Sequence, residues 1–305
     1  MKVFDSIEAY AAQHSRSRVA LGYFDGIHAG HRAVIDACCR EKGEDTAVVL
    51  TFRESPAAAL GYPVPPALTD LDRKTGLLAQ AGADAVIYAD FNTLRDLSPE
   101  AFVNTILREK LGAVTVACGY NYRFGKGGAG DTDTLVKLCA AVGITATVVN
   151  PVSMDGEDVS STCIRALLGA GEIARANRML GSPYAIGGVV RSGNHIGTGL
   201  GFPTANLPIG AGLCVPRYGV YASRVTVGGI SYRGATNIGV RPTVESGGEV
   251  LCETFLIDYA GGDLYGREAL CELLEFVRPE RRFSSFGELQ EQVMRDIAAV
   301  KEKNA

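Results

Sequence analysis

The 305-residue sequence has no tryptophan, only four histidines and no long apolar run. Because no stretch approaches the roughly 20 apolar residues that cross a bilayer, we expect no membrane-spanning helix. The first residues lack the apolar core of a secretory signal. The eight cysteines are scattered without a CxxC pair, which predicts reduced, mostly buried thiols in a cytoplasmic protein. A net charge of −4 argues against a surface that binds nucleic acid by neutralising phosphates.

The chain is too long for one ordinary core, and 47% of its residues are hydrophobic. Its texture changes near Pro183, from apolar runs alternating with helical patterns to β-type runs separated by glycines. We therefore predict two domains, 1–182 and 183–305, joined by a tight hinge.

The first domain is expected to be of the α/β class. The runs at 47–52 and 85–88 are unbroken, which is typical of parallel strands buried on both faces. Between them the spacing predicts a helix over 71–82. Ser98 and Pro99 are expected to open another helix as N-cap and first helical residue. This alternation predicts a Rossmann-like, doubly wound fold.

The second domain is expected to be a small antiparallel β-barrel with a C-terminal helix. The β-type runs at 219–227 and 230–233 flank Gly228 and Gly229, which predicts a hairpin with a two-residue turn. The closing helix is predicted from a stripe at helical spacing, formed by Phe286, Leu289, Val293, Ile297 and Val300.

Two of the four histidines lie in the segment GYFDGIHAGH at residues 22–31. A helix that begins near residue 28 places His28 and His31 one above the other on its first turn. Backbone N–H groups at a helix N-terminus attract anions, and Gly26 and Gly30 permit close approach. The pattern indicates a phosphate-binding site. The alternatives are a capping histidine beside a surface histidine, or a zinc site for which no third ligand is evident.

This segment resembles the nucleotidyltransferase signature of the bacterial bifunctional riboflavin kinase/FAD synthetase family. Further blocks follow in the expected order: GYNYRFG at 119–125 with GGAGD at 127–131, VSSTCIR at 159–165, and GLGFPTAN at 199–206. The resemblance runs nearly end to end. It implies an FMN adenylyltransferase domain followed by a riboflavin kinase domain, which with ATP and Mg²⁺ convert riboflavin to FMN and FMN to FAD with release of pyrophosphate.

Adenylyl transfer needs positioning and charge neutralisation, because the attacking FMN phosphate is already an anion and requires no general base. Donors to the phosphates are expected from His28, His31 and Arg165. Further nucleotide and phosphate contacts are expected from Gly22, Phe24, Asp25, Gly26, Gly30, Ser161 and Thr162. Flavin contacts are expected from Asn121, Tyr122, Arg123, Phe124 and Asp131. Tyr122 and Phe124 are equally compatible with a core position.

Riboflavin phosphorylation needs a base, because the ribityl hydroxyl is neutral, and Mg²⁺ to steady the transferred phosphate. Thr204 and Asn206 point the same way in an extended segment and are the expected Mg²⁺ ligands, with nucleotide phosphates completing the site. Glu253 is the expected base, since large apolar neighbours raise the pKa of an acid. The alternative is an outward-facing charge. The resemblance adds Gly199, Gly201 and Tyr221 toward the nucleotide, and Arg278 toward the flavin.

The sequence departs from the family pattern at four positions. Tyr23 replaces a common asparagine, Ser55 a histidine, Thr198 a lysine or arginine, and Phe255 a histidine. These changes affect expected rate and affinity more than identity.

Two other functions stay open: a single-activity nucleotidyltransferase for another small phosphate, and a non-catalytic flavin-binding sensor. Some members of the resembled family form dimers or higher oligomers, so the resemblance includes a homo-oligomer among the expectations.

Overall fold

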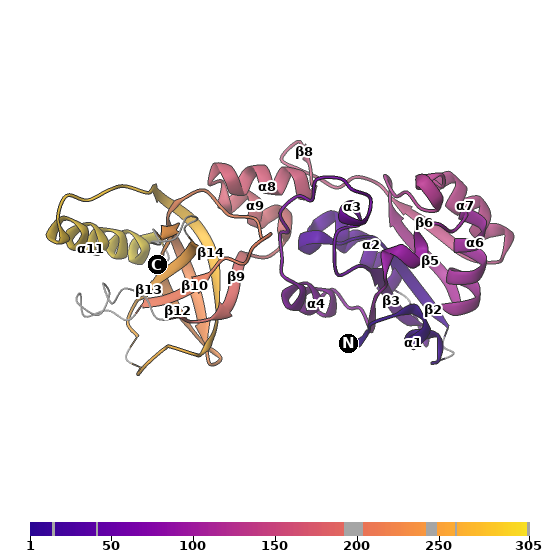
Figure 1. Ribbon diagram of the computed structural model, residues 1–305, viewed down its shortest axis with the longest axis horizontal. Helices are drawn as coiled ribbons and strands as arrows, with labels where there is room; N and C mark the ends of the chain where they lie inside the picture. The colour runs from indigo at the N-terminus through magenta and orange to yellow at the C-terminus, as the bar shows by residue number, and fades with distance from the viewer. Residues whose placement is uncertain (14–15, 41, 192–203, 242–248, 260, 304–305) are drawn as a thin grey trace. The chain divides into compact units, whose positions relative to one another are not determined.

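The computed structural model describes residues 1–13, 16–40, 42–191, 204–241, 249–259 and 261–303 (Figure 1). The chain divides into two compact units, Met1–Ser161 and Thr162–Ala305. The boundary expected at residue 182 between the two activities stays a prediction.

The first unit is built on a parallel sheet in the order β1–β4–β3–β2–β5–β6. Its strands are β1 (Lys2–Phe4), β2 (Ser17–Leu21), β3 (Thr46–Thr51), β4 (Ala85–Tyr88), β5 (Ala113–Gly119) and β6 (Thr145–Val149). Its longer helices are α2 (Ala29–Cys39), α4 (Leu71–Gln80) and α7 (Thr132–Ala141). Shorter elements are α1 (Ile7–Ala11), η1 (Asp25–Ile27), α3 (Pro56–Ala59), α5 (Phe91–Leu94), η3 (Lys126–Gly128), β7 (Ser153–Met154) and β8 (Glu157–Asp158). The predicted α/β class is confirmed.

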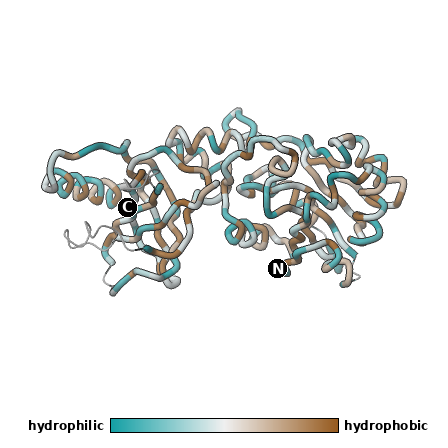
Figure 2. Tube along the Cα trace, viewed as in Figure 1, coloured by the Kyte–Doolittle hydropathy of each residue, from teal (hydrophilic) through white to brown (hydrophobic). Residues whose placement is uncertain are grey.

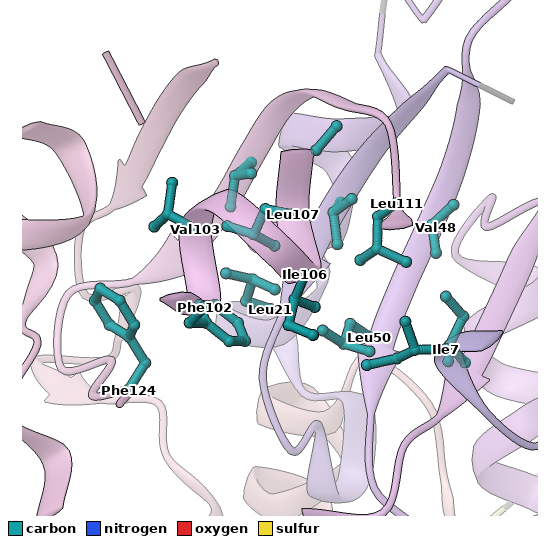
Figure 3. Packing of buried hydrophobic residues seen from close by; sticks show 14 of the residues in the cluster. Ile7, Leu21, Val48, Leu50, Phe102, Val103, Ile106, Leu107, Leu111 and Phe124 are labelled. Carbon is teal, nitrogen blue, oxygen red and sulfur yellow. The ribbon is translucent and has the colours of Figure 1, made fainter. Parts of the chain in front are cut away.

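Both faces of this sheet are buried, as unbroken apolar strands require. Val48 and Leu50 of β3 join one hydrophobic cluster, shown in Figure 3, whereas Val49 between them joins a second cluster with residues of α2 and α4. Successive side chains of a strand point to opposite faces, so the helices must cover the sheet from both sides.

The helix predicted after Ser98 begins as expected but widens. Ser98 caps α6 (Pro99–Ala101) by accepting a hydrogen bond from the N–H of Ala101, and the chain continues as the π-helix η2 (Phe102–Lys110). In η2 the apolar residues Phe102, Val103, Ile106 and Leu107 are all buried (Figure 3). Their spacing of about four residues fits the wider turn as well as it fits an α-helix.

The second unit contains an antiparallel sheet in the order β10–β13–β12–β11–β14–β9. Its strands are β9 (Tyr184–Val189), β10 (Thr204–Pro208), β11 (Gly219–Val227), β12 (Ile230–Arg241), β13 (Glu249–Leu256) and β14 (Glu268–Pro279). A bridge between Arg191 and Asn206 joins the two edges, with the N–H of Arg191 donating to the carbonyl of Asn206 at 2.9 Å. The sheet therefore curls into the predicted barrel. The predicted hairpin is also confirmed, with Gly228 and Gly229 at φ of 58° and 81°.

Helix α11 (Phe286–Lys303) closes the barrel as predicted, and hydrophilic and hydrophobic residues alternate along it (Figure 2). Val293, Ile297 and Val300 pack against the sheet in one cluster with Ala222 and Ala235.

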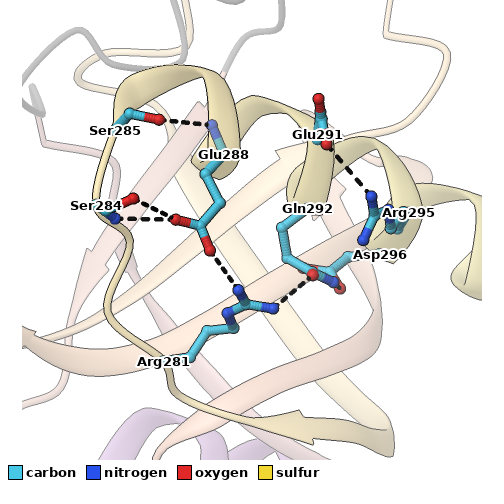
Figure 4. Close-up of polar contacts among 8 residues, drawn as sticks. All are labelled: Arg281, Ser284, Ser285, Glu288, Glu291, Gln292, Arg295 and Asp296. Carbon is cyan, nitrogen blue, oxygen red and sulfur yellow. Dashed lines mark hydrogen bonds and ion pairs between the residues drawn. The ribbon is translucent and has the colours of Figure 1, made fainter.

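The start of α11 is fixed by polar contacts (Figure 4). The hydroxyl of Ser285 accepts from the N–H of Glu288 at 3.2 Å, and the Glu288 carboxylate accepts from the N–H and hydroxyl of Ser284. Arg281 adds an ion pair to Glu288. The Ser285 contact satisfies an N–H group that the first helical turn leaves without an intrahelical partner, and the contacts of Glu288 hold the segment just before the helix.

Helices α8 (Ser161–Ala170) and α9 (Ile173–Leu180) precede the barrel. The side-chain amide of Asn177 in α9 donates to the carbonyl of Leu273 at 2.8 Å and accepts from the N–H of Tyr184 at 2.7 Å. Helix α9 is therefore attached to strands β14 and β9 of the second unit.

Candidate functional site

The loop after β2 carries backbone strain. Phe24 and Ile27 have φ of 56° and 41°, the left-handed region that side chains rarely adopt, and Gly26 has φ of 80°. Both nonglycine residues are almost fully buried, so packing holds them there. Such strain gathers at sites where the chain is shaped for a ligand.

The loop delivers the two histidines to the start of α2. The rings of His28 and His31 stack with centroids 3.6 Å apart and an angle of 17° between planes. His28 is the N-cap of α2, and its Nδ1 accepts from the N–H of His31 at 3.3 Å. A neutral imidazole that accepts at Nδ1 carries its proton at Nε2. His28 therefore caps the helix, as one alternative expected, and also stacks on His31, as the spacing predicted; phosphate binding by the two rings stays a prediction.

Burial keeps the second imidazole neutral. It lowers the pKa of His31 well below the usual range, and the charges of His28 and Lys74 act in the same direction. The Nδ1 atom of His31 is buried and has no hydrogen-bond partner among the described residues. A buried polar atom of this kind costs free energy unless a ligand satisfies it.

Two of the predicted phosphate-side residues, Asp25 and Ser161, are in contact at this loop. The Asp25 carboxylate is buried and accepts from the N–H of Leu68 at 2.8 Å, while the Asp25 carbonyl accepts from the Ser161 hydroxyl at 3.1 Å. Ser161, the first residue of α8, therefore contacts residues 22–28 after β2, which we call the glycine loop. Thr162 is exposed and Arg165 is half-buried on the same helix. Their contacts with phosphate stay predictions.

Two glycines make room for the rings of the site itself. A Cβ at Gly22 would lie 3.0 Å from the Phe24 ring, and a Cβ at Gly30 would lie 3.2 Å from the ring of His28. Gly30 was expected to permit close approach to a ligand. In addition, the lack of a side chain at Gly30 leaves room for the His28 ring.

The predicted flavin loop divides into exposed and buried residues. Asn121 and Arg123 are exposed. Phe124 belongs to the hydrophobic core, and Tyr122 packs against it with the two rings 5.9 Å apart. Asp131 caps α7 by accepting from the N–H of Thr134 at 2.9 Å. The core alternative thus describes the Phe124 ring, and the flavin contacts of all five residues stay predictions.

In the second unit the strand register builds a polar row. Asn206 of β10 pairs with Glu253 of β13, and Glu253 pairs on its other side with Asn237 of β12. Directly paired residues of antiparallel strands project to the same face, with Cβ atoms about 5 Å apart. Asn206 is 1% exposed, and neither of its amide atoms has a hydrogen-bond partner among the described residues. Thr204, two residues earlier, lies on the same face.

Other predicted residues of this unit have structural partners. Tyr221 is fully buried, and its hydroxyl donates to the carbonyl of Arg217, while burial raises the pKa of that hydroxyl. Arg278 lies in the same row as Glu253 but three strands away, and its guanidinium forms an ion pair with the buried Asp296. Their ligand contacts stay predictions. Gly199, Gly201 and Thr198 lie outside the described residues.

Two departures from the family pattern have local explanations. Ser55 caps α3 by accepting from the N–H of Ala57, and Phe255 packs in the cluster under α11.

Sequence reasoning missed Lys74, and it did not place Asn237 beside Glu253. Lys74 is 4% exposed. Its position three and four residues before the apolar Leu77 and Leu78 places it on the buried face of α4, and this spacing could have revealed it. Asn237 is brought beside Glu253 by the register of two strands, for which the sequence gives no local signal. Within the described ranges no group of three or more His, Cys, Asp or Glu side chains is placed to hold a metal ion, and no helix there is long and apolar enough to cross a membrane.

Comparisons with known proteins assign both units. The family model of FAD synthetase matches residues 10–163, and that of riboflavin kinase matches residues 180–304. A bifunctional riboflavin kinase/FMN adenylyltransferase from Pseudomonas fluorescens is 35% identical over 99% of this chain and 97% of its own length. One from Escherichia coli K12 is 36% identical over 93% and 91%.

A solved structure extends the likeness to the fold. The crystal structure named as a macrolide-efflux protein from Streptococcus pneumoniae has a TM-score of 0.85 at 28% identity and covers 94% of both chains. Together with the two family models and the full-length relatives, the fold and the two candidate sites lead to one conclusion. The chain belongs to the bifunctional riboflavin kinase/FMN adenylyltransferase family.

Proposed function

We propose that the chain phosphorylates riboflavin with ATP to give FMN and then adenylylates FMN with a second ATP to give FAD and pyrophosphate. The observation that carries this proposal is the presence of a separate, chemically distinct polar site in each unit. The first offers N–H donors toward phosphate, which adenylyl transfer requires, whereas that reaction needs no general base. The second contains a carboxylate between two amides, as phosphorylation of a neutral alcohol requires.

In the first unit the stacked imidazoles serve the phosphates of ATP. The oxygen of the FMN phosphate attacks the α-phosphorus, and the bond to the departing pyrophosphate breaks. Negative charge on the phosphate oxygens is stabilised by N–H donors, which here include Nε2 of His28 and the backbone at the start of α2. Because His31 is neutral, this ring acts as a hydrogen-bonding group rather than as a cation. Arg165, Thr162 and Ser161 are proposed to add donors from α8.

In the second unit Glu253 is the proposed base. Its carboxylate takes the proton of the ribityl hydroxyl as the hydroxyl oxygen attacks the γ-phosphorus of ATP. Two neutral amides in the same row, Asn206 and Asn237, are proposed to orient the reactants.

The residues present also fit Mg²⁺. The buried Asn206 amide oxygen, without a partner among the described residues, and the Thr204 hydroxyl are hard oxygen ligands. Mg²⁺ bound there with nucleotide phosphates would neutralise phosphate charge. We assign the reactions to the cytoplasm, because none of the eight cysteines, all of them in the described ranges, forms a disulfide and that compartment keeps thiols reduced.

The decisive experiment follows both half-reactions on one preparation. Full-length protein is incubated with riboflavin, ATP and Mg²⁺, and FMN and FAD are separated over time; FMN is expected first and FAD after it. A single-activity nucleotidyltransferase would form no ADP in the presence of riboflavin. A flavin sensor would bind flavin tightly without turnover.

Single substitutions separate the two sites. H28A is expected to lower FAD formation from FMN by about 10²–10³ while FMN formation persists. E253Q is expected to lower FMN formation by about 10²–10⁴ and leave FAD formation unchanged. E249Q on the same strand, whose carboxylate pairs with the exposed Arg191, is the matched control and should retain both activities. Equal loss of both activities in a folded H28A or E253Q protein would contradict the two-site proposal.

A further inference from the structure

A buried lysine lies behind the glycine loop. The ammonium of Lys74 in α4 donates to the carbonyl of Phe52 at 2.9 Å and lies 4.3 Å from the centroid of the Tyr23 ring and 5.8 Å from that of Tyr88. The residue is 4% exposed. A buried ammonium is costly in free energy unless dipoles or π-faces compensate it. Here the carbonyl of Phe52 and the two tyrosine rings supply that compensation.

The charged groups around Lys74 leave its charge available to the site. The charge of Asp25 in η1 favours the protonated form of Lys74, whereas the charge of Lys74 lowers the pKa of His31 in α2. The Arg53 guanidinium lies 4.8 Å from the centroid of the Tyr88 ring and forms an ion pair with Asp5. In the part of the chain that the structure describes, Lys74 itself forms no ion pair. Its positive charge is therefore not cancelled by a contacting carboxylate.

The aromatic partner belongs to the loop that holds the histidines. Tyr23 lies directly before the strained Phe24, and the Tyr23 carbonyl accepts from the hydroxyl of Thr51 at 2.9 Å. The loop is thus joined to β3 by hydrogen bonds, including one from the N–H of Gly22 to the carbonyl of Leu50, and to α4 by the contact between the ammonium and the ring. An asparagine at position 23 would offer no π-face for this second contact.

Resting on the proposed adenylyl transfer, we propose that Lys74 is a positioning residue for that reaction. Its ammonium holds the Tyr23 ring, and with it the glycine loop, and keeps a positive charge behind the paired imidazoles where the triphosphate of ATP binds. The imidazole of His31 is neutral, so the electrostatic attraction for phosphate comes in part from Lys74.

The proposal predicts a pH dependence with a definite sign. Burial lowers the pKa of Lys74 to about 7, although the charge of Asp25 opposes the shift. Since the protonated form is the active one, kcat/KM for ATP in FAD formation should fall as pH rises through about 7. Bound phosphates stabilise the ammonium, so the corresponding fall in kcat should occur at higher pH.

Substitutions of Lys74 test the role of its charge. K74M keeps length and apolar packing but removes the charge; we expect kcat/KM for ATP at pH 6.5 to fall about tenfold or more and the descending limb to disappear. K74R should recover part of the rate without a descending limb near pH 7. K137M, which removes an exposed lysine on α7, is the matched control. Thermal unfolding and riboflavin phosphorylation, measured on the same samples, report any loss of folded protein.

Substitutions of Tyr23 test whether Lys74 acts through the ring. Y23F keeps the π-face and should behave like the parent protein. Y23L should reproduce part of the K74M defect, and the double variant K74M/Y23L should be less impaired than the product of the two single effects. Full multiplicativity would overturn the proposed route through Tyr23.

A second readout separates this inference from the proposed function. The ring C–H resonances of the four histidines are followed by NMR against pH, with His31 assigned by substitution. Removing the charge of Lys74 should raise the pKa of His31. If the parent makes no FAD, the proposed function fails, and the histidine titration still decides whether Lys74 charges the site. If K74M keeps both the pH profile and the His31 titration of the parent, the inference is wrong.

Discussion

Substituting Gly30 by alanine would test how tightly the His28 imidazole is placed. The new Cβ would lie 3.2 Å from Cε1 and 3.3 Å from Nδ1 of His28, so the ring must move by a few tenths of an ångström. The same ring stacks on His31 and caps α2 through Nδ1. One small displacement therefore disturbs both imidazoles and the helix start.

The two consequences for stability nearly cancel. Alanine in place of a helical glycine gains about 0.5–1 kcal/mol, and a weakened N-cap loses up to about 1 kcal/mol. The free energy of unfolding of G30A should stay within about 1 kcal/mol of the parent. Catalysis is more sensitive: since a 1 Å misplacement can cost about 10², FAD formation should fall by about 3- to 10-fold.

The assay measures FAD formation from FMN, riboflavin phosphorylation and urea unfolding on the same preparations. Gly76 in α4 provides the matched control, because a Cβ there meets nothing within 4 Å; G76A should gain stability and keep full activity. Riboflavin phosphorylation should be unchanged in both variants. Unchanged FAD formation in a folded G30A protein would refute the idea that the placement of His28 limits the reaction.

Two further predictions concern the second unit. D296A leaves the partly buried Arg278 without its carboxylate and should lower the free energy of unfolding of this unit by about 3–5 kcal/mol. E291A breaks an exposed ion pair and should lower it by less than about 1 kcal/mol. Equal effects of the two variants in urea unfolding would contradict the burial argument. A fragment beginning at Thr162 should unfold at higher urea concentration than one beginning at Ser182, because only the longer fragment keeps the buried apolar residues of α9; identical midpoints would show that α9 adds nothing to the barrel.

The sequence alone determined features that depend on neighbours along the chain. Strand and helix positions follow from apolar periodicity, and the turn at Gly228 and Gly229 follows from the demand for positive φ. The stacking of His28 and His31 was predictable for the same reason, since residues three apart meet on one helical turn. Family identity also came from contiguous motifs, which the comparisons confirmed.

Only the tertiary structure decided which distant residues meet. The Ser161 hydroxyl reaches the carbonyl of Asp25 across 136 positions, and the ammonium of Lys74 reaches a ring 51 positions earlier in the chain. Placing Asn237 beside Glu253 depends on strand register, and a slip of one residue would turn every side chain of the strand to the other face. Register and long-range contacts are fixed by the packing of the whole unit. A local segment of the sequence does not specify which distant segment it will contact.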